Sequence, residues 1–178
     1  MDLRERIKAS VIQSGMTEAG FVEISDLRFY PEIRKICQEN TCRNYGKTWA
    51  CPPGIGTLEQ CWERVNQYSI MLLFSKKFQL EDSFDLEGMT AGHAAFKKTV
   101  DQMADQVKQL TGGCLILSNE GCGRCKSCTY PDAPCRFPEK LYPSLEGFGF
   151  IVSELAAKAG IRYNNGSNTV TYFGAVFF

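Results

Sequence analysis

The sequence is short of histidine, of net charge and of long apolar runs, and each shortage argues against a class of function. Its only histidine, His93, leaves no basis for a histidine-rich metal centre or a catalytic triad. We expect this side chain on the solvated surface. The 20 Lys and Arg residues balance the 20 Asp and Glu residues, so no basic excess points to nucleic acid or to an anionic membrane.

No apolar run approaches the roughly 20 residues that a membrane-spanning helix needs. The first ten residues, MDLRERIKAS, carry alternating charges where a signal peptide would have an apolar core, and this predicts a cytoplasmic protein. The glycines form neither a GxGxxG fingerprint nor a phosphate-binding loop, so nucleotide binding has no support.

The sequence does contain enough apolar material for a folded core. Hydrophobic residues make up 44% of the 178 residues, and aromatic residues make up 12%. A chain of this length can bury a core without help from metals or disulfides. No linker, repeat or low-complexity segment divides it, so we expect a single metal-binding domain over residues 1–178.

Apolar periodicity predicts helices that alternate with strands along most of the chain. The expected helices cover residues 2–14, 58–68, 90–110 and 144–159, and the expected strands cover residues 20–24, 69–78, 114–118 and 169–178. The period is lost over residues 26–56, which we expect to form a loop. The pattern predicts an α/β or α+β fold, in which a single-layer sheet of about four strands is flanked by helices and carries two cysteine-rich loops.

Nine cysteines are the most informative feature of the composition. An odd number of thiols in a reducing compartment does not suit a disulfide framework, and clustered thiols in such a chain usually hold metal. Seven of the nine fall into two clusters, which differ in their spacing.

Four cysteines, defined here as the cysteine quartet, follow the pattern C-x2-C-x2-C-x6-C; they are Cys122, Cys125, Cys128 and Cys135. Three thiolates spaced by two residues can surround one corner of a 4Fe–4S cluster while a more distant fourth closes it, as in the bacterial ferredoxin run. Zinc sites usually bring four cysteines as two separated pairs. The spacing favours iron–sulfur, with zinc or uncoordinated thiols as the alternatives.

The residues around the quartet suit a thiolate-ligated cluster. Gly121 and Gly123 are expected to allow close backbone approach and to direct N–H groups toward the sulfurs. Arg124, Lys126 and Arg136 are expected to offset the negative charge. The aromatic residues that flank the two cysteine clusters are Tyr45, Trp49, Tyr130 and Phe137. We expect these rings to pack the loops, with water exclusion or ligand binding as the alternative.

Three further cysteines, defined here as the cysteine trio, follow the pattern C-x4-C-x8-C; they are Cys37, Cys42 and Cys51. A cluster held by three thiolates would leave one iron open to a ligand. The alternative, a site that a fourth residue completes, is the commoner arrangement for metals. Cys61 is the candidate fourth ligand, but it shares an apolar helix face with its neighbours and is expected to pack in the core. Cys114 begins an apolar strand and is also expected to pack.

The cysteine motifs resemble a known family. The trio with Pro52-Pro53-Gly54, the run from Cys122 to Pro138 that continues into Tyr142-Pro143-Ser144-Leu145-Glu146-Gly147, and the tail from Tyr172 to Phe178 are similar to the predicted metal-binding proteins called domain of unknown function 2284. This resemblance implies metal binding, with iron–sulfur as the expected form, in anaerobic bacteria and archaea, and it implies no reaction. The short stretch from Gly15 to Ile24 also resembles the start of corrinoid-dependent iron–sulfur reductases such as epoxyqueuosine reductase.

Together these features predict a cytoplasmic iron–sulfur protein with a redox role. One or two 4Fe–4S clusters would pass electrons to an unidentified partner protein or small molecule, without nucleic acid or membrane. One alternative is a zinc-binding scaffold without redox chemistry. Another is an enzyme that uses an open iron at the trio, with Arg43, Tyr45 and Lys47 as its polar groups.

Overall fold

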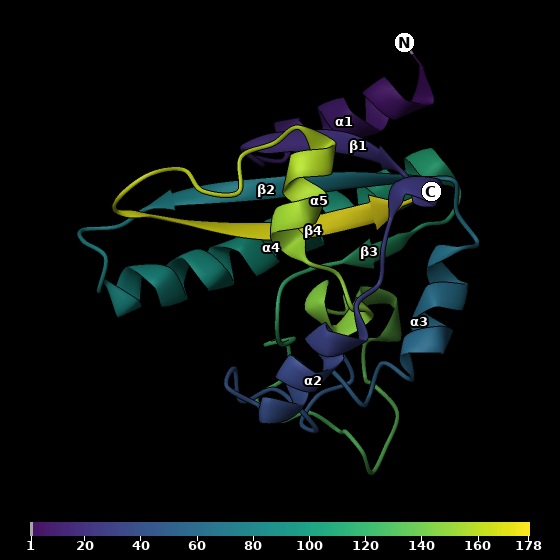
Figure 1. Ribbon diagram of the computed structural model, residues 1–178, viewed down its shortest axis with the longest axis vertical. Helices are drawn as coiled ribbons and strands as arrows, with labels where there is room; N and C mark the ends of the chain where they lie inside the picture. The colour runs from purple at the N-terminus through teal and green to yellow at the C-terminus, as the bar shows by residue number, and fades with distance from the viewer. Residues whose placement is uncertain (1) are drawn as a thin grey trace.

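A four-stranded antiparallel sheet forms the centre of the computed structural model, with helices on both of its faces (Figure 1). The strands lie in the order β1-β2-β4-β3, with the bounds β1 Glu18–Glu23, β2 Ile70–Gln79, β3 Leu115–Leu117 and β4 Thr169–Phe177. The structure describes residues 2–178; residue 1 of the expected domain lies outside them. The fold is α+β, which confirms the predicted class and the four expected strands.

Within residues 2–178, the chain forms five α-helices and three 3-10 turns. The α-helices are α1 (Leu3–Gln13), α2 (Pro31–Glu39), α3 (Leu58–Val65), α4 (Leu86–Thr111) and α5 (Val152–Ala159), and the 3-10 turns are η1 (Ile24–Asp26), η2 (Pro138–Lys140) and η3 (Glu146–Phe148). None of the helices within residues 2–178 has both the length and the apolar character to cross a membrane.

Two apolar cores lie on opposite faces of the sheet. Side chains alternate between the faces of a strand, so Leu72 and Phe74 of β2 pack toward α1 and α4, while Met71 and Leu73 pack toward α5 and η3. All four are fully buried. Each such side chain contributes about 1.5–3 kcal/mol of transfer free energy. The prediction that β2 is buried on both faces is therefore confirmed.

Capping residues set the starts of two helices. Thr57 accepts a hydrogen bond from the Gln60 N–H while the Gln60 side chain accepts one from the Thr57 N–H, which is the capping box that begins α3. Asp85 accepts from the Gly88 N–H and starts α4 a turn earlier than the predicted residue 90.

The predicted loop over residues 26–56 is corrected by the structure, because it contains helix α2. Pro31 occupies the first helical turn, where its missing N–H costs nothing. Asn40 ends the helix in the left-handed conformation, at a φ of 57°. This short helix has no buried residue, because its apolar face, formed by Ile33, Ile36 and Cys37, borders the trio cavity and not the core.

The predicted helix over residues 144–159 is also corrected. Ser144 accepts a hydrogen bond from the Gly147 N–H, but this closes only the single turn η3. Gly149 then adopts a φ of 81°, which interrupts the helical path, and α5 begins only at Val152.

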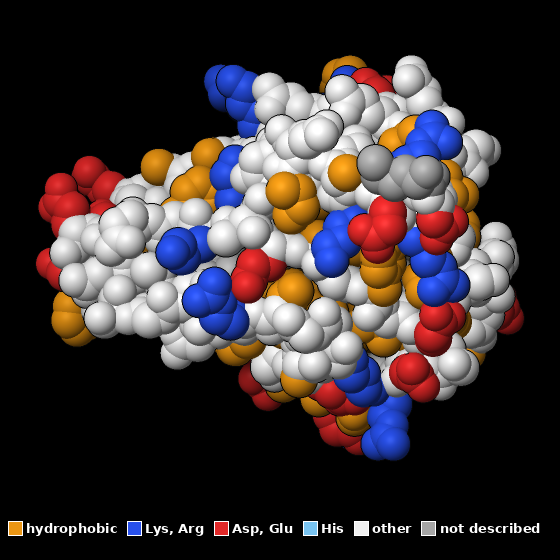
Figure 2. Space-filling view, turned by 90° about the horizontal axis from the view of Figure 1, so that it is seen from above, with side chains coloured by type: hydrophobic (Ala, Val, Ile, Leu, Met, Phe, Trp, Pro, Cys, Tyr) orange, Lys and Arg blue, Asp and Glu red, His pale blue; other side chains and the backbone are white. Residues whose placement is uncertain are grey.

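The segment just before η3 holds the cysteine loops against the sheet. The Ser118 N–H at the end of β3 donates to the Pro143 carbonyl, and the Leu145 N–H donates back to Ser118. The neighbouring Ser144 N–H donates to the carbonyl of Ala50 in the trio loop. Both loops therefore lie below one end of the sheet in Figure 1. The face seen from above carries interspersed blue and red side chains over most of its area, and red side chains gather at its left end (Figure 2).

Candidate metal centre

The four cysteines of the quartet line one cavity. This cavity has a volume of about 220 Å³, and all four side chains are half-buried around it. Its other wall comes from the trio loop, through Lys47, Thr48 and Trp49. The loop that the sequence motif predicted thus folds around a shared space, between the end of β3 and η2.

Hydrogen bonds shape the quartet loop from inside. The Tyr130 N–H donates to the Cys128 Sγ at 3.5 Å, and Arg136 donates to the Ser127 carbonyl at 2.8 Å. Arg124 lines the cavity but its guanidinium is paired with Asp101 of α4. The positive charge of Arg124 is therefore already partly compensated by Asp101 and is not wholly available to a bound cluster. The sequence pattern did not indicate this pairing.

The cysteine trio lines a second and more apolar cavity, of about 410 Å³. Cys37 comes from α2, Cys42 follows it on the exposed side, and Cys51 is buried at the inner end of the loop. Burial, followed by the charge of Glu146, raises the pKa of the Cys37 thiol to about 11. Burial also raises the pKa of Cys51. Metal binding at this site would have to release these thiol protons.

The two cysteine loops interlock. The Gly121 N–H, one residue before the quartet, donates to the Cys51 Sγ of the trio at 3.3 Å. Trp49 of the trio loop stacks edge-on against Tyr130, with 4.8 Å between ring centroids, and its Nε1–H donates to the Ala133 carbonyl. The glycine N–H was predicted to serve a sulfur of its own cluster, whereas it serves a sulfur of the other one.

Cys61 and Cys114 line neither cysteine cavity. Cys61 is fully buried in the core beside Val65, and its Sγ accepts a hydrogen bond from Arg34 at 3.3 Å. Cys114 is half-buried and packs against the other core. The structure therefore agrees with packing roles for both thiols.

Three polar residues near the trio were not anticipated. Glu120 and Glu146 line the trio cavity, and burial raises the pKa of Glu146 to about 7. Lys97 of α4 donates to the carbonyls of Asn119 and Gly121, and burial lowers its pKa to about 8. Glu146 belongs to the family motif Tyr142–Gly147, but the sequence assigned no role to it, to Glu120 or to Lys97. The contact between the end of β3 and the segment before η3 brings these residues to the cysteines.

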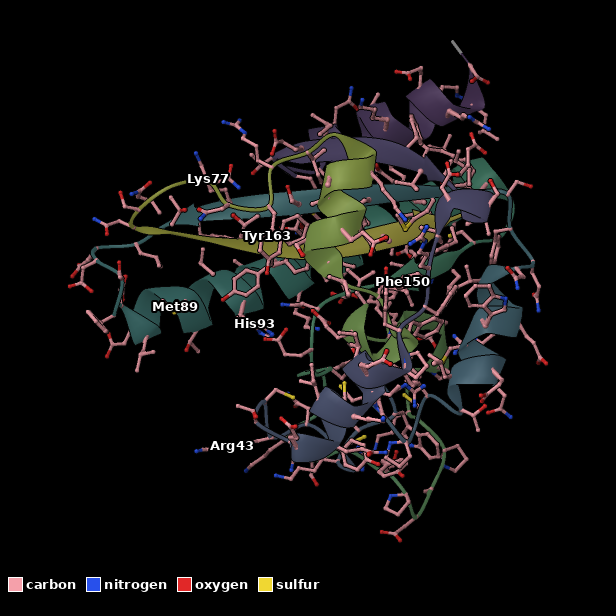
Figure 3. All side chains as sticks on the ribbon, viewed as in Figure 1. Arg43, Lys77, Met89, His93, Phe150 and Tyr163 are labelled. Atoms are coloured by element: carbon pink, nitrogen blue, oxygen red, sulfur yellow. The ribbon has the colours of Figure 1, made fainter. Side chains whose placement is uncertain are left out.

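His93 is not the freely solvated residue that the sequence predicted. Its side chain is 31% exposed, its Nε2 lies 3.2 Å from the Glu120 carbonyl oxygen, and its ring meets Tyr172 edge-on. Figure 3 shows it on α4, facing the region between the sheet and the cysteine loops. The reason is that α4 crosses behind this region, which its apolar stripe alone does not reveal. Arg43, by contrast, extends away from the molecule in the same view.

Thiols are the shared donors of the two candidate sites. Within residues 2–178, no three His, Cys, Asp or Glu side chains lie close enough together to hold a single metal ion. The thiols of each group surround a cavity rather than a point. Thiolates are soft ligands that suit iron–sulfur clusters as well as zinc.

Fold and site together define the molecule as an α+β protein with two adjoining, cysteine-lined cavities. The profile of the predicted metal-binding protein family DUF2284 matches residues 20–178, and the chain belongs to this family. The resemblance expected from the cysteine motifs is therefore confirmed. A search of curated proteins finds no match.

Among solved structures, the fold is similar to that of epoxyqueuosine reductase from Streptococcus thermophilus, with a TM-score of 0.51 and 10% sequence identity. The match covers 99% of this chain and 46% of that protein, so the chain spans less than half of its length. At this identity the likeness concerns the fold alone.

Proposed function

We propose that the protein is a cytoplasmic iron–sulfur protein with an electron-transfer role. The quartet would hold a 4Fe–4S cluster, and the trio would hold a second cluster with one iron free of cysteine. The observation that carries this proposal is the enclosure of a common cavity by all four quartet thiols, next to a second cavity bordered by all three trio thiols. Bound clusters would supply one-electron redox chemistry.

The chain's own residues would bind the clusters, tune them and shield them from water. Backbone N–H groups at Gly121 and Tyr130 already donate to Cys51 and Cys128, and such donors stabilise the reduced state of a thiolate-ligated cluster. The contact between Trp49 and Tyr130 covers the space between the loops with aromatic surface.

The interlocked loops also support electron passage between the two sites. Gly121 directly precedes the first quartet cysteine and hydrogen-bonds a trio cysteine, so only one residue of backbone separates the two ligand sets at this point. The onward electron partner would be a protein or a small molecule that meets the exposed side of the trio near Cys42.

Anaerobic purification followed by iron and sulfide analysis and electron paramagnetic resonance tests the proposal. We expect matched amounts of iron and sulfide and a reducible cluster signal. Cys128→Ser should remove the quartet signal and Cys51→Ser should alter the trio signal. Cys114→Ser, a half-buried thiol outside both cavities, is the matched control and should leave both signals unchanged.

A colourless protein that contains zinc and no sulfide, even after anaerobic reconstitution, would overturn the iron–sulfur assignment. It would favour the zinc-binding scaffold, which predicts that a chelator unfolds the cysteine loops. Cluster signals that survive both Cys128→Ser and Cys51→Ser would contradict the ligand assignment.

A further inference from the structure

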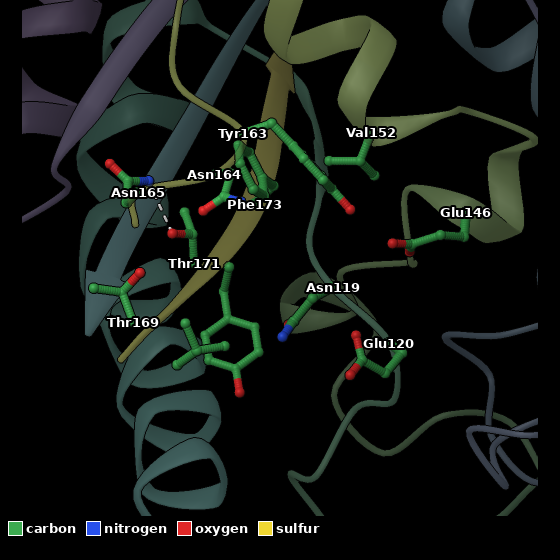
Figure 4. Close-up of a pocket in the computed structure, with 12 residues that line it drawn as sticks. Asn119, Glu120, Glu146, Val152, Tyr163, Asn164, Asn165, Thr169, Thr171 and Phe173 are labelled. Carbon is green, nitrogen blue, oxygen red and sulfur yellow. Dashed lines mark hydrogen bonds between the residues drawn. The ribbon is translucent and has the colours of Figure 1, made fainter. Parts of the chain in front are cut away.

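A third cavity adjoins the trio and belongs to neither cysteine group. It has a volume of about 370 Å³ and lies beside β4, below the segment that connects α5 to β4 (Figure 4). Glu120 and Glu146 line both this cavity and the trio cavity, so the two spaces meet at these carboxylates.

The cavity has an acidic and hydrogen-bonding wall. Its lining includes the carboxylates of Glu120 and Glu146 and the amide of Asn119, and no Lys or Arg belongs to it among the described residues. Two side chains outside the lining approach its carboxylates: Lys97, whose Nζ is bound to the carbonyls of Asn119 and Gly121, and His93, whose Nε2 lies 3.8 Å from the Glu120 Oε1. A ligand that carries negative charge, such as a phosphate, would meet two carboxylates here, with no lining Lys or Arg to pair with it.

Two polar atoms of this wall are buried and have no partner. Asn119 is only 4% exposed and its Nδ2 has no hydrogen-bond acceptor, while the Oε2 of Glu146 has no donor. Buried polar groups almost always have a hydrogen-bond partner, because burial removes their hydrogen bonds to water and an unpaired group gains no other bond to offset that cost. In Figure 4, Asn119, Glu120 and Glu146 gather on the side of the cavity opposite β4.

The opposite wall is aromatic. Tyr163 stacks on Phe173 of β4, with 5.6 Å between centroids and 22° between planes. Tyr163 is 55% exposed, so one face of this pair stays accessible. Figures 3 and 4 show the Tyr163 ring beside the cavity, in front of β4. An aromatic surface of this kind can receive a flat ring or a cation.

We infer that this cavity binds a small, flat organic cation of the amidine or guanidine class. Its N–H groups would donate to the carboxylates of Glu120 and Glu146 in charge-assisted hydrogen bonds, which are stronger than neutral ones, and the positive charge would favour the ionised form of Glu146. Its flat body would lie against Tyr163, and the Asn119 amide would donate to an acceptor atom of the ligand or to a water that the ligand holds. The inference concerns binding alone and holds whichever metal the cysteines bind.

Titration of the anaerobically purified full chain with benzamidine tests this inference. Heteronuclear NMR should show saturable shifts of the amides around Asn119, Tyr163 and Thr171, while benzoate, the anionic counterpart, should produce none. Glu120→Gln and Glu146→Gln should each weaken benzamidine binding by about tenfold or more, as loss of a charged hydrogen bond predicts. Glu63→Gln, an exposed carboxylate of α3 that lines none of the three cavities, is the control and should change nothing.

Tyr163→Leu is a second variant, which does not alter a buried charge. It should weaken benzamidine binding, while the rest of its NMR spectrum should remain that of the folded protein. The inference is overturned if benzamidine does not saturate, if benzoate binds equally well, or if Glu63→Gln weakens binding as much as the two cavity variants do. Cluster analysis of the same samples reports on the cysteine sites separately, so failure of one proposal is distinguishable from failure of the other.

Discussion

Two glycines at the start of the quartet loop have the same backbone conformation and different surroundings. Gly121 and Gly123 share a φ of +68°, a left-handed conformation that costs other L-residues about 1–2 kcal/mol. A Cβ at Gly123 would have no atom within 4 Å, whereas a Cβ at Gly121 would lie 3.0 Å from the Asn44 Oδ1. The two positions therefore share the backbone cost and differ in the steric contact.

We expect Gly123→Ala to lower the free energy of unfolding by about 1 kcal/mol, and Gly121→Ala to lower it by about 1 kcal/mol more, because crowding adds to the backbone strain. Urea denaturation of both variants under identical metal loading measures the difference. Because the Gly121 N–H binds Cys51, the Gly121 variant should also shift the trio signal.

Asn44→Ala completes a double-mutant cycle with Gly121→Ala. Asn44 itself donates to the Cys42 carbonyl, so its single substitution has a cost of its own that the cycle subtracts. The coupling free energy from this cycle should account for most of the extra stability that Gly121→Ala loses relative to Gly123→Ala. Equal losses for the two glycine variants, or a cycle with no coupling, would refute the packing of Asn44 against the quartet loop.

Three further predictions concern the fold and its charges. Burial raises the pKa of Glu146 from 4.5 to about 7, so between these pH values the folded protein keeps a proton on Glu146 that the unfolded chain has lost. The free energy of unfolding, measured relative to Glu146→Gln, should therefore fall by about 3 kcal/mol between pH 4.5 and 7. Parallel stability curves for the two proteins would contradict this. Thr57→Ala should cost about 1 kcal/mol in chemical denaturation by removing the capping box of α3; an unchanged midpoint would argue against it. Gly20→Ala should lower the free energy of unfolding by about 1–3 kcal/mol or more, because its Cβ would overlap the Ala159 carbonyl oxygen of α5. Unchanged stability of this variant would show that α5 does not pack there.

The layered core could be predicted because its signals are local. The continuous apolar run of β2 and the stripe of α4 through Phe96, Val100 and Met103 encode burial directly, and all three of these side chains are fully buried. Thr57 likewise predicts the start of α3, where the structure has its capping box. Signals of this kind depend on neighbours in sequence, so they survive without knowledge of the tertiary fold.

The remaining elements depend on partners far along the chain. Helix α2 has no buried residue and is held instead by Arg34, which donates to the Gly147 and Gly56 carbonyls. The break before α5 depends on Gly149, whose carbonyl accepts from the Tyr30 N–H. Neither contact leaves a periodic trace in the sequence.

The cysteine groups could be located from spacing, but their relation to each other could not. Motif spacing groups the four quartet cysteines, and in the structure these four side chains line one cavity. The bond from Gly121 to Cys51 joins residues 70 positions apart, and Glu146 reaches the trio only because η3 packs beneath β3. Such juxtapositions arise from topology, and a single sequence carries no signal for them.

Anomalous scattering from crystals of the anaerobically purified protein, recorded at the iron and zinc absorption edges, tests the iron–sulfur assignment most directly. We expect strong iron peaks inside the quartet cavity and inside the trio cavity, with no zinc peak at either. A zinc peak coordinated by the quartet thiols, or an absence of iron at both sites in protein reconstituted with iron and sulfide, would contradict it.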